Sequence, residues 1–225
     1  MKELKQCHVL VTPTSFGRSD PPLKRDLENA VGRVTYNTTG KPQSSGRLAE
    51  LLPDVDGFIA GLDVIDRPAL ANAPHLRVVA RYGIGTDRVD LQAAAENGIV
   101  VTNTPGANAV AVAELTLGLL LNLARPIMAA AAQTRTGQWP RTKGVSLQDK
   151  TLGIIGLGAI GKEVARRLRG FDCRVLAYDV FVDEAFAGEF GVSMTTMDEL
   201  LRASDFVTLH VPVLPATRDM VNAGF

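Results

Sequence analysis

Cysteine is scarce in this chain. The 225 residues contain two cysteines, Cys7 and Cys173, which lie far apart and lack the spacing of metal ligands, so we predict neither a disulfide framework nor a metal site. Each cysteine stands at the start of a short apolar run that we interpret as a buried strand, where a free thiol behaves as a small hydrophobic group. This usage favours a reducing compartment, and we expect a cytoplasmic protein.

An excess of charge of either sign is also missing. Lys and Arg together number 24 and Asp and Glu together number 24, so the formal net charge is zero. Without an excess of basic residues, we expect no positively charged surface that could bind the phosphate backbone of a nucleic acid. We therefore expect no nucleic-acid partner.

Long apolar runs are absent as well. The longest, residues 115–124, is interrupted by Thr116, Gly118 and Asn122 and is too short to span a bilayer, so a buried helix is predicted there. The N-terminal stretch MKELKQCHVLVT has neither an apolar core nor a small-residue cleavage site, and we predict no signal peptide. No membrane association is expected.

The chain does contain an alternation of short apolar runs with helical patterns. Strands are predicted at residues 8–12, 57–60, 76–80 and 99–102, with helices at 21–31, 67–72 and 89–96. A long helix is predicted at 109–135, and a second series of strands and helices starts at Thr151. Such alternation produces parallel sheets, so the fold class is α/β. The turn cluster at residues 103–106 marks a boundary between domains 1–103 and 104–225.

A glycine motif follows the predicted strand at residues 151–155. Gly156-Leu157-Gly158-Ala159-Ile160-Gly161 has the spacing G-x-G-x-x-G and runs directly into a predicted helix. Gly156 permits a tight turn, Gly158 leaves room for a pyrophosphate, and Gly161 lets the helix pack against the strand. The free N–H groups and the positive dipole end of that helix favour phosphate. The motif predicts a Rossmann-type dinucleotide site.

Two further strand ends belong to the same prediction. The strand at residues 174–178 ends at Asp179, roughly 20 positions beyond the glycines, where a carboxylate can bind both ribose hydroxyls. Such a carboxylate repels a 2′-phosphate, so NAD is predicted in preference to NADP; a simple turn role for Asp179 is the alternative. His210 lies near the end of the strand at residues 206–211. We favour a position beside the cofactor or in the packing over a role as general base.

A second glycine loop, Arg81-Tyr82-Gly83-Ile84-Gly85-Thr86-Asp87, also lies between a predicted strand and a predicted helix. Its two glycines leave consecutive N–H groups that can form a nest for a small carboxylate, and Arg81 adds a positive charge of suitable shape. A connector whose glycines serve turn geometry alone accounts for the same residues equally well. The residue types leave these two interpretations balanced.

These stretches resemble the D-isomer-specific 2-hydroxyacid dehydrogenases. The resemblance runs from about Val9 to the last residue, and the motifs keep the order and spacing of that family. The matching segments are RYGIGTDRVDLQAAAENGIVVTNTPGANAVAVAELTLGLLLNLAR, KTLGIIGLGAIGKEVARRLRGF, the dipeptide Tyr178-Asp179 and ASDFVTLHVPVLPATRDMVN.

The resemblance implies two Rossmann-like domains, a flavodoxin-like substrate-binding domain and an NAD-binding domain, with the active site in the cleft between them. It implies a substrate site that includes Asn108, near the hinge, and a loop that binds the substrate carboxylate. The residues of that loop are Arg81, Tyr82, Gly83, Ile84 and Gly85.

In the second domain, the resemblance implies that Ala159 and Ile160 contact the pyrophosphate of NAD through their backbone. It implies further that Asp179 binds the adenosine ribose. The residues that flank the cofactor are then His210, Val211 and Pro212. Members of the family are usually dimers or tetramers that associate through the nucleotide domain and the long helix, so we expect a homo-oligomer.

The family transfers hydride between C2 of the substrate and nicotinamide, using a histidine that exchanges the hydroxyl proton, an acidic partner and an arginine. No residue of this sequence matches those three, and His8, His75 and His210 all fall in other contexts. The chain ends at Phe225, before the segment that would carry them, so no catalytic residue is named. We expect a C-terminally truncated NAD-binding domain and a chain that is inactive and marginally stable by itself.

Oxidation of 3-phosphoglycerate on the way to serine is the leading expectation for the substrate. Glyoxylate or hydroxypyruvate reductases share the same motifs, and the choice depends on the pocket. A phosphorylated substrate requires additional cations, for which Arg81, Arg135 and Lys143 are candidates. A non-catalytic NAD-binding remnant or corepressor-like module is the alternative from another class. L-2-hydroxyacid dehydrogenases are disfavoured because their glycine motif lies near the N-terminus.

Overall fold

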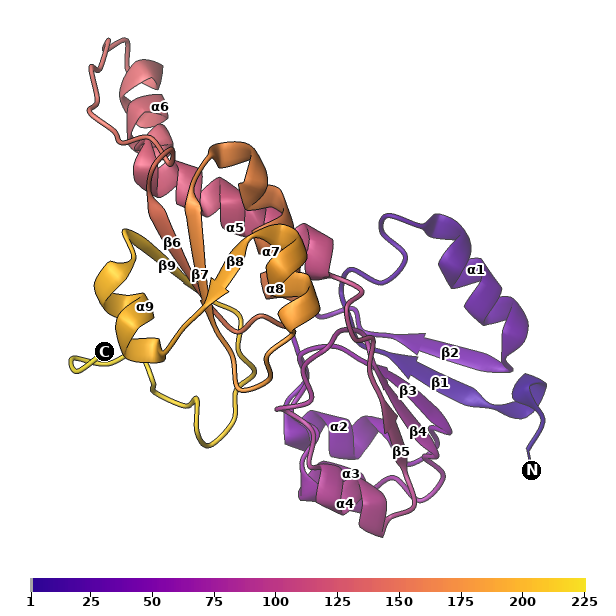
Figure 1. Ribbon diagram of the computed structural model, residues 1–225. Coiled ribbons are helices and arrows are strands. Elements are labelled where there is room, and N and C mark those ends of the chain that lie inside the picture. Colours follow the sequence, from indigo (N-terminus) through magenta and orange to yellow (C-terminus); the bar gives the residue numbers. More distant parts are fainter. Residues whose placement is uncertain (1) are drawn as a thin grey trace. The chain divides into compact units, whose positions relative to one another are not determined.

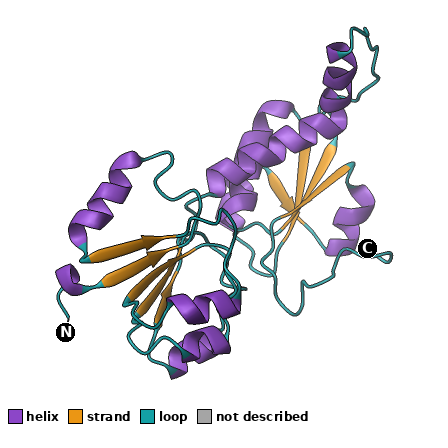
Figure 2. Ribbon diagram, turned by 180° about the vertical axis from the view of Figure 1, so that it is seen from behind, coloured by secondary structure: helices purple, strands orange, loops and turns teal. Residues whose placement is uncertain are grey.

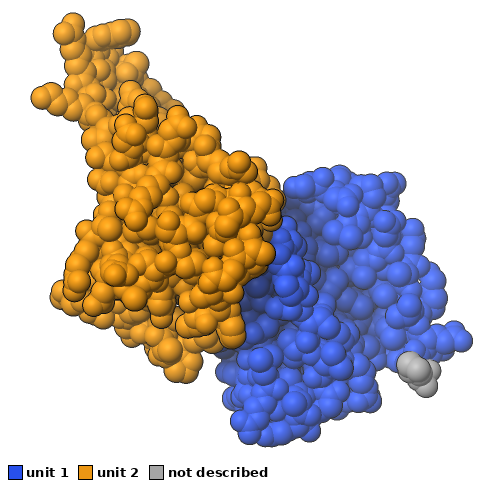
Figure 3. All heavy atoms as spheres, viewed as in Figure 1, with its two compact units in different colours: residues 1–107 blue, residues 108–225 orange. Residues whose placement is uncertain are grey.

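The computed structural model describes residues 2–225, which fall into two compact units (Figure 3). Unit 1 ends at Ala107, and unit 2 begins at Asn108. The sequence placed the domain boundary at residues 103 and 104, so the loop from there to Ala107 groups with unit 1. Each unit has its own parallel sheet and its own buried core.

Unit 1 is built on a five-stranded sheet in which all neighbouring strands are parallel (Figure 1). Its elements are a 3-10 turn at Leu4–Gln6, β1 (His8–Val11), α1 (Pro21–Ala30), β2 (Arg33–Tyr36), α2 (Ser45–Leu51), β3 (Gly57–Ala60), α3 (Arg67–Ala71), β4 (Val78–Arg81), α4 (Leu91–Glu96) and β5 (Val100–Thr102). The strand order β2-β1-β3-β4-β5 is that of flavodoxin-like folds. The order reverses between β1 and β3, which makes the carboxyl ends of these two strands the usual place for a ligand.

Alternating side chains on β1 build the cores on the two faces of this sheet. Val9 and Val11 pack with Leu23 and Leu27 of α1, whereas Leu10 belongs to the core formed with α2, α3 and α4. Successive residues of a strand point to opposite faces, so one short apolar strand supports helices on both sides (Figure 2).

Unit 2 contains a four-stranded parallel sheet in the order β8-β7-β6-β9. Its elements are α5 (Ala109–Ala124), α6 (Ile127–Arg135), β6 (Thr151–Ile155), α7 (Ala159–Leu168), a 3-10 turn at Arg169–Phe171, β7 (Arg174–Tyr178), α8 (Glu184–Phe190), β8 (Val192–Met194), α9 (Met197–Ala203) and β9 (Phe206–Leu209). Helices α5, α7 and α8 share one core with the sheet, and α9 packs on the other face. The order is that of the first half of a Rossmann sheet.

The long helix expected at residues 109–135 is two helices. It breaks at Arg125 and Pro126, and α5 and α6 are bent by 69°. Pro126 has no N–H to donate into the helical ladder, and its ring obstructs the preceding turn, so one continuous helix cannot pass through it.

Within residues 2–225, no single helix has both the length and the apolarity needed to cross a membrane; the bent pair α5–α6 reaches them only when its two halves are combined.

The predicted fold class is confirmed, since both units are α/β with parallel sheets and the two strand orders are flavodoxin-like and Rossmann-like. Predicted strands and helices differ from the observed ones mainly at their ends. The helix expected at 89–96, for example, begins at Leu91, because the side chain of Asp90 caps it by accepting the N–H of Ala93.

Candidate functional site

The three glycines of the nucleotide motif have different surroundings. A Cβ added at Gly161 would lie 2.1 Å from the carbonyl oxygen of Gly156, and one at Gly156 would lie 2.8 Å from the carbonyl carbon of His210. Gly156 also has a φ of +95°, which favours glycine. At Gly158, by contrast, no atom lies within 4 Å of an added Cβ. The loop is closed by packing at both ends and open at Gly158, where a ligand can approach the backbone.

The helix that follows this loop begins without a side-chain cap. α7 starts at Ala159, with Gly158 as its N-cap residue, and no side chain accepts a hydrogen bond from the first turn. The first N–H groups of a helix have no intrahelical acceptor and carry the positive end of its dipole. The exposed start of α7 therefore provides the donors that a phosphate requires.

Asp179 lies beside the same loop, directly after β7. Its Oδ2 accepts the N–H of Leu157 at 2.6 Å, and its Oδ1 accepts the N–H of Phe181 at 3.0 Å. The Phe181 bond is the turn role that the sequence left open, and the Leu157 bond ties the carboxylate to the glycine loop. Each carboxylate oxygen has a further lone pair, so the half-buried group can still accept from ribose hydroxyls.

The end of β9 lies against the other side of the glycine loop. The N–H of His210 donates to the carbonyl of Ile155 at 2.7 Å, and its Nε2 lies 3.0 Å from the Thr208 hydroxyl. Burial lowers the pKa of His210, so the ring is neutral near pH 7. A Cβ at Gly156 would also lie 3.0 Å from Cγ1 of Val211. The structure thus places the proposed cofactor residues of β6, β7 and β9 at one edge of one sheet, followed by exposed Pro212.

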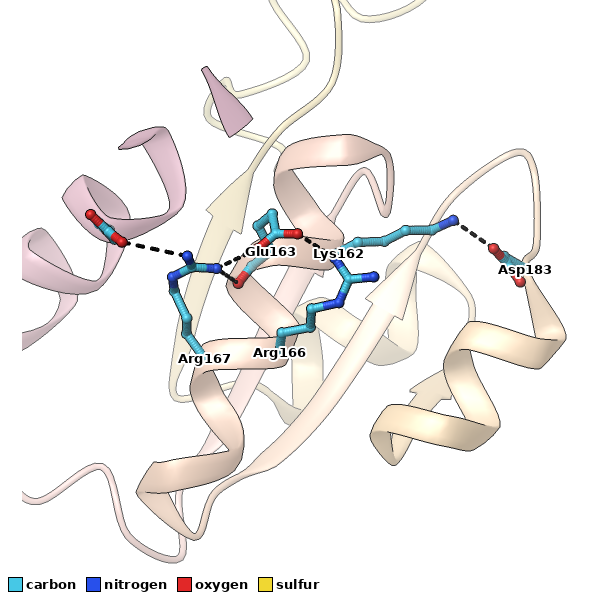
Figure 4. A network of polar contacts seen from close by, with 6 residues as sticks. Lys162, Glu163, Arg166, Arg167 and Asp183 are labelled. Atoms are coloured by element: carbon cyan, nitrogen blue, oxygen red, sulfur yellow. Dashed lines mark hydrogen bonds and ion pairs between the residues drawn. The ribbon is translucent and has the colours of Figure 1, made fainter. Parts of the chain in front are cut away.

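Surface ion pairs connect α7, the helix that follows the glycine loop, to the elements around it (Figure 4). The ammonium of Lys162 lies 2.5 Å from Asp183, which caps α8, and this hydrogen bond, together with the N–H of Phe186, lowers the pKa of Asp183. Arg167 pairs with Glu163 on its own helix and, at 3.4 Å, with Glu114 on α5. Lys162 extends toward Asp183 rather than the loop, so these charges orient α7 between its neighbours.

In unit 1, Arg81 supports the second glycine loop from behind. Its side chain is buried, its Nε donates to the carbonyl of Gly85 at 2.8 Å, and its Nη1 donates to that of Ala60 at 2.7 Å. A Cβ at Gly83, whose φ is +150°, would lie 3.8 Å from Nη2. Two of the five guanidinium N–H groups are therefore committed to backbone carbonyls, and a direct carboxylate contact of the kind expected from the sequence has to come from the remaining N–H groups of Nη1 and Nη2.

The loop presents backbone donors. Across residues 2–225, the N–H groups of Ile84 and Gly85 have no acceptor. The side chain of Asn103 donates to the carbonyl of Ile84 at 2.8 Å, and the N–H of Thr104 donates to that of Gly83 at 3.1 Å. Neighbouring N–H groups without partners, on a backbone whose carbonyls are already bound, are the requirement for a carboxylate nest.

The remaining candidates belong to unit 2. Asn108 is the N-cap residue of α5, and its exposed side chain makes no capping hydrogen bond. Arg135 is the last residue of α6, and Lys143 lies in the exposed segment between α6 and β6.

The sequence did not reveal a buried polar group at the reversal of strand order in unit 1. Thr12 follows β1 and is 2% exposed, and Asp63 comes shortly after β3 and is 1% exposed. Asp63 accepts from the Thr12 hydroxyl, from the N–H of Gly61 at 2.8 Å and from the N–H of Gln43 at 2.7 Å. The available signal was position, because both residues follow strands at a point where α/β sheets bind ligands.

A hollow of about 410 Å³ borders this polar group. Residues from three loops line it: Thr12, Pro13, Thr14 and Ser15 after β1, Gly40 and Pro42 after β2, and Gly61 and Leu62 after β3, together with Tyr82. Tyr82 belongs to the second glycine loop, so the hollow and the nest adjoin, and its ring packs edge-on against Phe16 with centroids 5.8 Å apart. The volume is in the range of small-molecule sites. Within the described part of the chain, no cluster of His, Cys, Asp or Glu has the arrangement of a metal site.

Comparison with known proteins gives a consistent result. Residues 117–225 match the D-isomer specific 2-hydroxyacid dehydrogenase, NAD binding domain family. The chain is 40% identical over 204 residues to a D-3-phosphoglycerate dehydrogenase of Methanocaldococcus jannaschii, an alignment that covers 89% of this chain and 39% of that protein. It is 36% identical over 207 residues to a hydroxypyruvate reductase of Thermotoga maritima, which covers 91% of this chain and 67% of the relative.

A comparison with solved structures points to the same group of enzymes. A D-lactate dehydrogenase of Aquifex aeolicus, solved with NAD and lactic acid, superposes with a TM-score of 0.79 at 28% identity, over 95% of this chain and 63% of that one. The chain spans about two fifths of the length of the Methanocaldococcus relative and about two thirds of that of the Thermotoga relative. Sequence, strand order and the glycine loop lead to the same assignment: the chain belongs to the D-isomer-specific 2-hydroxyacid dehydrogenases, a family of oxidoreductases whose cofactor is NAD.

Proposed function

We propose that this protein is an NAD-dependent oxidoreductase of D-2-hydroxy acids. The observation that carries the proposal is the loop of unit 2, which is open only at Gly158 and bonded through Leu157 to the carboxylate of Asp179. When bound, NAD accepts or supplies the hydride at C2 of the substrate. The residues described below bind and orient the two reactants.

In unit 2, the N–H groups of Ala159 and Ile160 at the start of α7 bind the pyrophosphate, and Asp179 accepts from the adenosine ribose. The neutral ring of His210, with Val211 and Pro212, flanks the cofactor. In unit 1, the N–H groups of Ile84 and Gly85 bind the substrate carboxylate. Arg81 keeps the carbonyls of Ala60 and Gly85 turned away from that site. Gly83 and Tyr82 complete the loop, and Asn108 contributes at the start of unit 2.

Two substrates have specific support. Oxidation of 3-phosphoglycerate, as in serine biosynthesis, is supported by 40% identity to a phosphoglycerate dehydrogenase. Reduction of hydroxypyruvate is supported by the hydroxypyruvate reductase, of whose length this chain covers 67%. Arg81, a candidate cation for a phosphate, is held by two backbone carbonyls at the glycine loop that we assign to the substrate carboxylate, which favours the second substrate.

We propose further that the protein is a cytoplasmic homo-oligomer that associates through α5. Leu115, Leu119 and Leu123 are 62%, 56% and 69% exposed, and their spacing of four places them on one face of this helix. Exposed apolar stripes of this kind mark interaction surfaces. Sedimentation of the protein and of Leu119→Glu tests the proposal, and a wild-type protein that is monomeric at micromolar concentration contradicts it.

The assignment is tested by titration with NADH, followed by titration of the NADH-loaded protein with D- and L-glycerate. We expect NADH to bind, D-glycerate to bind more tightly than L-glycerate, and no turnover, because no residue of this sequence matches the catalytic arginine, acid or histidine of the family. NADH binding without binding of either glycerate would leave a nucleotide-binding module, and absence of NADH binding would contradict the assignment of the loop itself.

A further inference from the structure

Resting on the proposed function, we propose that the hollow at the strand-order reversal of unit 1 receives the far end of the substrate and selects an unphosphorylated 2-hydroxy acid, because its floor is backed by the buried carboxylate of Asp63. Tyr82, which lines the hollow, precedes the nest of Ile84 and Gly85 by two residues in the same loop. A three-carbon acid whose carboxylate lies on the nest therefore extends its C3 toward the hollow.

The surface of the hollow is neutral. The residues that form it supply hydroxyl groups from Thr14, Ser15 and Tyr82, while the hydroxyl of Thr12 is bonded to Asp63, and none of the lining residues is Lys or Arg. Hydroxyl groups can donate to and accept from a C3 hydroxyl or carbonyl. A dianionic phosphate, in contrast, is normally bound by guanidinium, ammonium or a helix start, each of which carries positive charge.

Asp63 makes the floor unfavourable for an anion. It lies directly behind Gly61 and Thr12, both of which border the hollow and donate to its Oδ2. All three of its partners are uncharged donors, so no cation among them offsets its charge. A charge with little exposure to water is screened weakly, and it repels a second anion placed a few ångströms away.

Two guanidinium groups lie near these residues, and both bond backbone carbonyls. Arg81 bonds the carbonyls of Ala60 and Gly85, and exposed Arg88 reaches the carbonyl of Leu62 at 3.5 Å. Neither side chain borders the hollow. Exposed Lys41 stands between Gly40 and Pro42, which border the hollow, so Lys41 and Arg88 are the cations that could turn toward a phosphate, and both are included in the test.

The test uses the chain loaded with NADH, so that a hydroxy acid binds without reacting, and compares D-glycerate with 3-phospho-D-glycerate by calorimetry. We expect D-glycerate to bind at least about 10-fold more tightly. Asp63→Asn removes the charge at nearly constant shape, and Thr14→Arg adds a cation at an exposed position that the fold tolerates. Each variant should shift the ratio several-fold toward the phosphorylated acid, whereas Arg88→Gln and Lys41→Gln should leave it unchanged.

Each outcome is decisive. Equal or tighter binding of 3-phospho-D-glycerate by the wild-type protein overturns the inference and leaves the proposed function intact. A preference for D-glycerate that Thr14→Arg does not alter overturns the assignment of C3 to this hollow, even if Asp63→Asn fails to fold. If the NADH-loaded chain binds neither acid, the proposed function fails, and the inference fails with it.

Discussion

Both units place a glycine loop directly after a strand in the interior of a parallel sheet, but the two loops expose their backbone in different ways. In unit 2 the loop runs straight into α7, and its open position, Gly158, lies at the helix start. In unit 1 the loop runs through a turn before α4 begins at Leu91, and its carbonyls accept hydrogen bonds from the side chains of Arg81 and Asn103 and from the N–H of Thr104. The unit 2 loop is thus shaped mainly by backbone packing, and the unit 1 loop mainly by hydrogen bonds to its carbonyls.

This difference determines what each loop can bind. The start of a ten-residue helix combines several N–H groups with a dipole, which suits a pyrophosphate. Within residues 2–225, the N–H groups of Ile84 and Gly85 in unit 1 have no acceptor, and no helix starts directly after them, which suits a single small carboxylate. Glycine spacing alone does not distinguish the two cases.

The largest effect should come from Gly161→Ala. Its Cβ would lie 2.1 Å from the carbonyl oxygen of Gly156, so α7 has to move away from the loop. We expect a loss of about 3 kcal/mol in the free energy of unfolding, measured by urea denaturation, and loss of NADH binding. In the matched variant Gly158→Ala the added Cβ meets open space, so stability should be kept while NADH binds more weakly.

Gly188→Ala provides the control for helix propensity. An added Cβ meets nothing within 4 Å at this position in α8, and we expect the variant to gain about 0.5–1 kcal/mol. If Gly158→Ala destabilises the protein as much as Gly161→Ala does, there is no room for a side chain at any of the three glycines. The proposed open position for a pyrophosphate in unit 2 would then be wrong.

A second effect should be confined to unit 1. Arg81→Met leaves the carbonyls of Ala60 and Gly85 without their donors in a buried place, and we expect a loss of about 2–3 kcal/mol in the free energy of unfolding. NADH affinity should stay unchanged, since the nucleotide loop belongs to unit 2. The comparison variant is Arg88→Met, which removes one exposed contact of 3.5 Å and should change stability by less than about 0.5 kcal/mol. Equal effects of the two variants would remove the structural role assigned to Arg81.

The cofactor loop could be predicted from the sequence because its requirements are local. Gly156, Gly158 and Gly161 have a fixed spacing between a strand and a helix, and the position of Asp179 follows from the length of one further strand. The main strands were also found, because short β-branched runs such as residues 151–155 bury on both faces. The prediction of one long helix was wrong, although Pro126 was the visible signal against it.

Other features depended on the folded arrangement. β2 has no fully buried residue, and β8 has three residues in all, so neither has a clear apolar pattern. α9 is the exception in this group, because it begins with a capping box at Thr196 and Glu199 that can be recognised in the sequence. The partnership of Thr12 with Asp63 could not be foreseen, because it depends on β1 and β3 being neighbours. Whether Arg81 binds a ligand or the backbone is likewise decided by geometry, not residue type.

A smaller effect, on binding rather than stability, is expected for Asp179→Ala. The variant removes the acceptor of the Leu157 N–H and the carboxylate proposed for the ribose, so the dissociation constant for NADH should rise by about 10-fold or more. The affinity for NADPH should decrease less than that for NADH, because the carboxylate charge that repels the 2′-phosphate is gone. Asp198→Ala, at an exposed site on α9, is the control and should leave both affinities unchanged. An unchanged preference for NADH in Asp179→Ala argues against this carboxylate as the selector.

The smallest effect should be a pH dependence that unit 2 owes to His210. Burial lowers the pKa of this ring from 6.5 in the folded protein, whereas in the unfolded chain the ring takes up a proton once the pH falls below about 6.5. Above that pH both states are neutral and His210 contributes no slope. Below it the unfolded state binds more protons, so the free energy of unfolding decreases, by at most about 1.4 kcal/mol per pH unit, until the folded ring also titrates.

His210→Asn should flatten that slope, which urea denaturation between about pH 7.5 and about pH 5.5 can measure. His8→Asn serves as the matched variant in unit 1, where the ring is hydrogen bonded to the Thr35 hydroxyl and the carbonyl of Asp54. A slope that persists in His210→Asn and disappears in His8→Asn would move the acid sensitivity from the nucleotide unit to the substrate unit. A slope that disappears in His210→Asn and persists in His8→Asn would assign the acid sensitivity to His210, at the strand end that packs against Gly156.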